Sequence, residues 1–128
     1  MNAINQSKRK ELLKPFMKHD YDYGGQIYYF ANLPLSVLQE LIEADLMGDM
    51  GPWNDCPGNA AFQVFMHSHP NFTAHGYAID FKRDDHRITI EGLEGTELSS
   101  SDIVDFANAF GAADEFECSN FKARCWYD

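Results

Sequence analysis

His67 and His69 are the residues whose types and spacing most directly suggest chemistry in this chain. They lie near the end of a segment, residues 61–69, that we predict to be a strand. Alternate side chains of a strand point to the same side, so both imidazoles would face one site. Two imidazoles so placed can bind a metal ion, and Zn²⁺ is the first candidate.

Asp80 lies ten residues after Pro70. The run His67-Ser68-His69-Pro70, followed by this Asp, resembles the signature of the JAMM (MPN+) metallopeptidases. The resemblance covers residues 67–80 and implies that His67, His69 and Asp80 are zinc ligands, with an upstream Glu as general base for the bound water. A zinc-dependent hydrolase, with zinc as its cofactor, is therefore the alternative hypothesis for this chain.

The position of Asp80 depends on the hairpin that contains it. If residues 84–85 form a two-residue turn, Ile79 faces Ile90 and Asp80 faces Thr89, so that apolar residues share one face and polar residues the other. This register predicts that Asp80 lies within a strand. Asp-Asp is not a preferred turn dipeptide, and a longer loop is the alternative.

Three features of the chain depart from the metallopeptidase signature. Tyr77 stands where that family has a Ser, three residues before the Asp. The family's Asp lies near the start of a helix, whereas Asp80 is predicted in a strand. The upstream Glu should come from a strand, yet Glu40 and Glu43 fall in a predicted helix. The chain also has no phosphate-binding Gly-rich loop and no G-x-S-x-G, so we assign no catalytic residue and favour a non-enzymatic function.

The charge distribution is strongly asymmetric. The net charge is −10, from 20 acidic and 10 basic residues, and no Lys or Arg occurs between Lys18 and Lys82. Such a balance disfavours binding to nucleic acid, because phosphate contacts require cationic groups. Acidic groups gathered on one face would instead attract a cationic partner and speed its association. The alternative is that the acidic surface serves solubility.

We therefore predict a small acidic protein-binding module. In size and charge it is similar to immunity- or inhibitor-type proteins that neutralise a basic partner. The candidate contact residues are five carboxylates and two aromatic anchors: Glu40, Glu43, Asp45, Asp49, Asp55, Trp53 and Tyr28. A homo-oligomer that hides aromatic surface is a further hypothesis.

Length and composition predict one domain spanning residues 1–128. A chain of this length with 45% hydrophobic residues can bury a core without disulfides. Its three cysteines form no CxxC, which favours a reducing, cytoplasmic location. No secretory signal or membrane-spanning stretch is expected, because no apolar run is long enough.

The predicted fold class is α+β, with a mostly antiparallel sheet of about five to six short strands, two long helices packed on it and an N-terminal helix. Pro15 should kink the first helix, predicted over residues 6–19. The two long helices are predicted at 34–47, with a Ser36–Gln39 capping box, and from Ser99, which caps with Asp102. Strands are expected on both sides of Gly24-Gly25, at 61–69, in the hairpin, and at 121–127.

Overall fold

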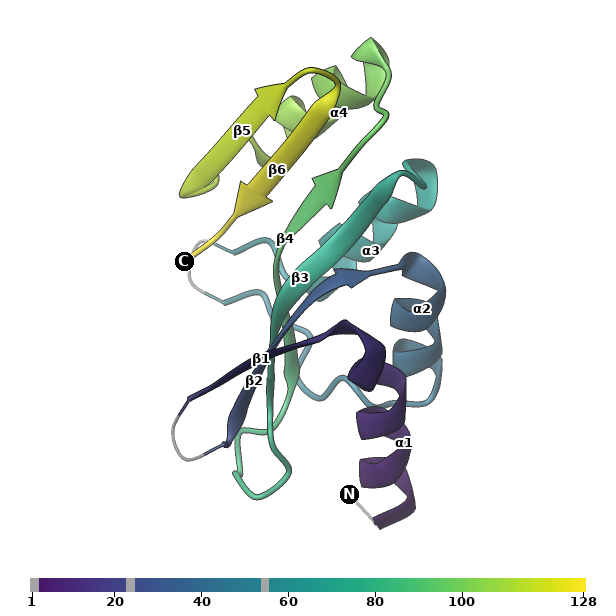
Figure 1. The fold of residues 1–128 in the computed structure, drawn as a ribbon, viewed down its shortest axis with the longest axis vertical. Coiled ribbons are helices and arrows are strands. Elements are labelled where there is room, and N and C mark those ends of the chain that lie inside the picture. Colours follow the sequence, from purple (N-terminus) through teal and green to yellow (C-terminus); the bar gives the residue numbers. More distant parts are fainter. Residues whose placement is uncertain (1–2, 23–24, 54–55) are drawn as a thin grey trace.

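The computed structural model describes residues 3–22, 25–53 and 56–128, with the backbone alone for residues 19–22, and shows an α+β fold (Figure 1). One antiparallel sheet of six strands has the order β1-β2-β3-β4-β6-β5. The strands are β1 (Met17–Asp22), β2 (Ile27–Leu33), β3 (Phe72–Ile79), β4 (Ile88–Gly95), β5 (Glu115–Ser119) and β6 (Lys122–Trp126). The helices are α1 (Ala3–Leu13), α2 (Leu35–Glu43), α3 (Asn59–Ser68) and α4 (Ser100–Phe110), with a 3₁₀ turn η1 (Lys14–Phe16).

The α+β class and the antiparallel sheet are as predicted, but the two long helices are not. The helix α2 has nine residues and α4 has eleven. The predicted Ser36–Gln39 capping box is wrong, because Pro34 is the N-cap of α2 and no side chain caps it. The capping box of α4 is confirmed: the Ser99 hydroxyl accepts from Asp102 N at 3.0 Å, and the Asp102 carboxylate accepts from Ser99 N at 3.0 Å.

Residues 61–69 do not form the predicted strand, since residues 61–68 belong to the helix α3 and His69 follows its end. The buried side chains are Phe62, Phe65 and Met66, whereas Val64 is 68% exposed. This is the i, i+3, i+4 pattern of a helix with one buried face, not the alternation of a strand. The correction matters for function because it removes the geometry that would have placed two imidazoles on one side.

The β3–β4 hairpin forms, but in another register than predicted. Ala78 pairs with Ile88, and Gly76 rather than Ile79 pairs with Ile90. The loop is long, because β3 ends at Ile79 and the Asp80 carboxylate accepts a hydrogen bond from Lys82 N at 3.0 Å, which starts a turn. Asp80 therefore lies outside the strands, at the beginning of the loop.

Both ends of the chain also differ in detail from the prediction. Pro15 does end the first helix, but the chain then enters β1 at Met17, so residues 17–19 are not helical. The final strand is confirmed as β6. Its partner β5 was not predicted, because its side chains are mostly exposed and lack the alternation of a half-buried strand.

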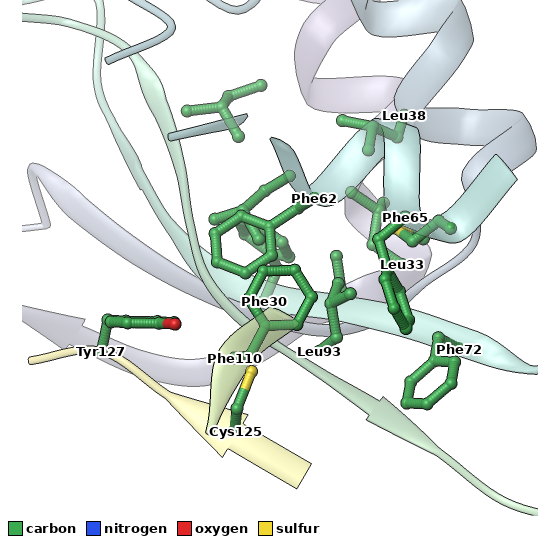
Figure 2. Close-up of a cluster of buried hydrophobic side chains, with 14 of the residues drawn as sticks. Phe30, Leu33, Leu38, Phe62, Phe65, Phe72, Leu93, Phe110, Cys125 and Tyr127 are labelled. Atoms are coloured by element: carbon green, nitrogen blue, oxygen red, sulfur yellow. The ribbon is translucent and has the colours of Figure 1, made fainter. Parts of the chain in front are cut away.

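The helices pack on one side of the sheet: α1, α2 and α3 lie against β2–β4, and α4 lies behind β5 and β6 (Figure 1). The core between these layers is rich in aromatic rings (Figure 2). The rings of Phe62 and Phe110 lie 5.0 Å apart, and those of Phe72 and Phe106 lie 4.7 Å apart. These contacts join α3 and α4 to each other and to the sheet.

No helix in the described residues has both the length and the apolar composition needed to cross a membrane. The longest helices, α1 and α4, have 11 residues each. A helix that spans a bilayer needs about 20.

The first half of β4 has no neighbouring strand among the described residues on the side facing α3, and Asn59 takes that place. The Asn59 side chain donates to Ile88 O at 2.7 Å and accepts from Ile90 N at 2.9 Å. Ile88 N donates to Met47 O at 2.8 Å. These bonds attach the segment between α2 and α3 to the edge of the sheet. They also give the buried backbone groups of Ile88 and Ile90 hydrogen-bond partners, which buried polar atoms require.

Candidate functional site

The two imidazoles and the carboxylate of the predicted zinc site are not brought together. His67 is exposed near the end of α3. His69 follows that helix, and both of its ring nitrogens are engaged: Nδ1 with Phe65 O at 2.8 Å and Nε2 with Asp105 Oδ2 at 3.0 Å. Asp80 lies at the opposite end of β3 from His69, about 25 Å away at the rise of an extended strand.

These positions do not fit a zinc centre. Within the described part of the chain, no three His, Cys, Asp or Glu side chains are placed to hold a metal ion. Burial alone would lower the pKa of His69, but the hydrogen bonds to Asp105 and Phe65 O and the charges of Asp105 and Asp102 together outweigh it and raise the pKa. His69 is thus a hydrogen-bonded residue that joins the end of α3 to α4, and its ring stacks on Phe65 with 3.9 Å between centroids.

Four of the five acidic candidates are exposed and follow one another in and just after α2. Glu40 and Glu43 lie on one face of α2, and Asp45 and Asp49 follow in the turns after it; all four are exposed. No ion pair of the described residues involves any of them. Asp55 lies outside the described residues. We call Glu40, Glu43, Asp45 and Asp49 the acidic α2 surface.

Trp53 is half-buried in the segment that follows this surface. The Arg87 guanidinium lies 5.3 Å from its ring centroid, a cation–π contact. The same guanidinium donates to Thr89 Oγ1 at 3.0 Å and to the Tyr77 hydroxyl at 3.1 Å. Arg87 is therefore engaged with the sheet and with Trp53, and leaves the acidic α2 surface without a paired cation.

Tyr28, the second aromatic candidate, lies elsewhere, in the wall of a cavity. This cavity of about 510 Å³ is formed between α1 and the adjoining ends of β2 and β3. Its apolar walls come from Leu13, Met17, Ala78 and Phe81. Cavities of this size with apolar walls and a few polar groups are typical ligand sites.

Arg9 is the principal polar group of the cavity wall. It is 3% exposed, its Nη2 donates to Ile79 O at 2.6 Å, and its guanidinium lies 4.2 Å from the centroid of the Phe81 ring. Burial lowers the pKa of Arg9 to about 10, partly opposed by Asp80, so the group stays charged at neutral pH. Its Nη1 is buried and has no hydrogen-bond partner among the described residues.

Asp80 faces the same cavity. It is 6% exposed, and its Oδ2 accepts a hydrogen bond from the Tyr28 hydroxyl at 2.8 Å. Burial would raise its pKa, but the hydrogen bonds from Lys82 N and Tyr28 outweigh that effect and lower it. The carboxylate is therefore ionised at neutral pH and fixed in position.

Arg9 was not among the functional residues predicted from the sequence. Its spacing contained a signal that it is buried: Arg9 lies three and four residues before Leu12 and Leu13, on the apolar face of α1. That register distinguishes Arg9 from Lys8 and Lys10, which are exposed.

Two further titratable groups lie on the side of the sheet that faces away from the core. Glu91 is half-buried, and its burial, together with the charge of Asp128, raises its pKa to about 7 against the opposing effects of Trp126 and Lys18. His75 is half-buried as well, and burial, with the charge of Arg124, lowers its pKa to about 4. Both groups therefore favour their neutral forms in the folded protein.

These two shifts predict opposite pH dependences of stability. The contribution of Glu91 to the free energy of unfolding is fully present below pH 4.5. It is lost as pH rises through about 7, because the pKa of Glu91 is raised in the folded protein. The contribution of His75 is complete above pH 6.5 and is lost as pH falls through about 4. Between pH 4.5 and 6.5 the two effects change the free energy of unfolding with pH in opposite directions and cancel.

We expect Glu91→Gln to remove the pH dependence of stability that Glu91 causes and to leave only the one that His75 causes. Its free energy of unfolding should rise relative to the wild type as pH increases, by up to about 1 kcal/mol per pH unit between pH 4.5 and 6.5. Urea unfolding at several pH values measures this. Glu94→Gln, an exposed site on the same strand, is the control. Equal pH slopes for Glu91→Gln and wild type would contradict the assignment.

The described residues thus contain exposed carboxylates on and after α2 and a cavity lined by the buried Arg9 and Asp80 and by Tyr28. No protein-family model, curated protein or solved structure matches this chain.

Proposed function

We propose that this chain is a small protein-binding domain whose acidic α2 surface takes a cationic protein, in the manner of immunity- or inhibitor-type proteins. The observation that carries the proposal is that Glu40, Glu43, Asp45 and Asp49 are all exposed and have no ion-pair partner in the described part of the chain. The negative electrostatic potential of such carboxylates is not neutralised by a neighbouring cation, so it can attract a cationic partner.

Charge complementarity of this kind acts mainly on association. It speeds encounter at low salt and excludes partners of like charge. Trp53, half-buried beside the surface, supplies an aromatic contact of the type that concentrates binding energy at interfaces. Tyr28 contributes to the cavity rather than to this surface.

The proposed setting is a reducing, cytoplasmic compartment. The three cysteines support it, because Cys56, Cys118 and Cys125 are all free thiols. The net charge of −10 supports a protein partner rather than a nucleic acid. A second copy of this chain is a less favourable partner for the acidic surface, since like charges would repel.

The test compares two variants that lose the same charge. One neutralises the acidic α2 surface: Glu40→Gln, Glu43→Gln, Asp45→Asn and Asp49→Asn. The control neutralises four exposed acids elsewhere: Asp84→Asn, Glu94→Gln, Glu97→Gln and Glu117→Gln. Each protein is immobilised at equal density and exposed to lysate of the cells that produce it.

We expect wild type and control to retain the same cationic protein, and the α2 variant to bind it at least about tenfold more weakly at physiological salt. Retention by the wild type should also fall as the salt concentration is raised, because screening weakens exposed charge pairs. Retention of the same proteins by all three, or retention that does not depend on salt, would contradict the proposal.

A further inference from the structure

The cavity between α1 and the sheet is a feature that the proposed function does not use. We infer that it is a binding site for a small amphipathic monocarboxylate, a molecule with an unbranched apolar chain and one terminal carboxylate. This site is distinct from the acidic α2 surface. The inference rests on the cavity's volume, its apolar walls, the charged groups that line it and the state of Arg9.

The apolar part of the ligand is specified by the cavity walls. Leu13 is 3% exposed and Ala78 is 3% exposed, and together with Met17 they form a wall without polar side-chain atoms. A polar ligand would lose its hydration against these side chains without compensation. An alkyl chain would instead remove apolar surface from water on both partners.

The charge of the ligand is specified by the cations around the cavity. Arg9, Lys10 and Lys14 all line it, against the carboxylates of Glu11 and Asp80. The carboxylate of Asp80 is already satisfied by Tyr28 and Lys82 N. The remaining positive charge at the lysines favours an anionic group and disfavours an ammonium.

The buried guanidinium of Arg9 adds a specific donor. Nη2 is used on Ile79 O, but Nη1 is buried without a partner among the described residues. A buried donor without an acceptor costs about 1–3 kcal/mol. Arg9 lines the cavity, so its charge favours a ligand carboxylate there. A shift of the guanidinium toward the cavity would let Nη1 donate a charge-assisted hydrogen bond and remove that cost, which a purely apolar ligand could not do.

The experiment titrates hexanoate, octanoate and decanoate, each below its micelle concentration, into the full chain by isothermal calorimetry. Decanol and decylamine serve as head-group controls. One variant removes the cavity lysines, Lys10→Gln with Lys14→Gln. Its matched control removes two exposed lysines that do not line the cavity, Lys8→Gln with Lys122→Gln.

We expect binding of one decanoate per chain, tightening about fourfold for each CH₂ group between hexanoate and decanoate, because each buried CH₂ contributes to transfer from water. Decanol and decylamine should bind at least about tenfold more weakly. The Lys10/Lys14 variant should also lose at least about tenfold, while the Lys8/Lys122 variant stays within about twofold of wild type. Amide NMR shifts should be centred on Arg9, Leu13, Ala78 and Phe81.

Arg9→Met tests the buried donor separately, and it should weaken decanoate more than decanol. If this variant does not fold, the lysine pair still decides the matter. Three results would overturn the inference: affinity that does not change with chain length, equal affinity for decanoate and decylamine, or NMR shifts located away from the cavity. None of these results bears on the acidic α2 surface.

Discussion

Replacing Gly76 with alanine is expected to prevent the protein from folding stably. A Cβ atom at this position would collide with the carbonyl oxygen of Thr89 and lie 3.0 Å from Ile90 Cα. Both contacts are to backbone in the neighbouring strand, so no side-chain rotation relieves them. The expected loss is more than about 4 kcal/mol, a large part of the stability of a domain this size.

The close approach at Gly76 comes from an irregularity in the β3–β4 pair. His75 pairs with Gly92, but Gly76 pairs with Ile90, so Glu91 is an extra residue in β4. Such a bulge bends the strand and brings its backbone toward the partner, where only glycine fits. Circular dichroism and urea unfolding of Gly76→Ala measure the effect directly.

Gly25→Ala is the matched control. Gly25 has φ = +82°, but a Cβ added there meets no atom of the described residues within 4 Å. Its cost is therefore the conformational strain alone, about 1 kcal/mol. If Gly76→Ala proved as stable as Gly25→Ala, the observed register between β3 and β4 would be wrong.

Asn59→Ala should have the second largest effect, a loss of about 3 kcal/mol. The substitution removes both hydrogen bonds by which Asn59 completes the edge of β4, to Ile88 O and from Ile90 N. Asn59 is 0% exposed, so water does not replace these partners unless the structure opens. Two buried backbone groups are then left unsatisfied, each costing about 1–3 kcal/mol.

The comparison for Asn59 is Asn71→Ala. Asn71 also donates its side-chain amide to a backbone carbonyl, Glu97 O at 3.1 Å, but it is exposed and water can replace the bond. Its loss should be less than about 1 kcal/mol. Urea unfolding measures both variants, and similar losses at the two positions would show that Asn59 does not support the sheet edge.

Local patterns predicted the elements in which sequence and packing agree. The Ser99–Asp102 capping box marks the start of α4 because both of its hydrogen bonds form within four residues. Pro15 ends α1 because its ring is incompatible with a helix interior. Such features depend mainly on the chain near them, although the equally local Ser36–Gln39 pattern did not form a cap.

The wrong predictions have two causes. A short apolar run can fit both the helical and the strand periodicity, and the register of a strand is set by its partner strand. Residues 61–69 contain apolar residues at both alternate and helical spacing, and packing of Phe62 and Phe65 against α4 selects the helix. The register of β3 and β4 is set by the bulge at Glu91, which no turn dipeptide reveals. For this reason the predicted register placed Asp80 in a strand, whereas the observed register places it after β3, in the wall of the cavity.

The residues alone predicted an acidic α+β chain with carboxylates on the polar face of a helix at residues 34–47, because composition and helical spacing are properties of the chain itself. Only the tertiary structure decided that Arg9 meets Asp80 and Tyr28 around one cavity. These residues come from α1, the loop after β3, and β2, so their meeting depends on how the sheet pairs and how α1 packs on it. Long-range pairing of this kind has no local signature in the sequence.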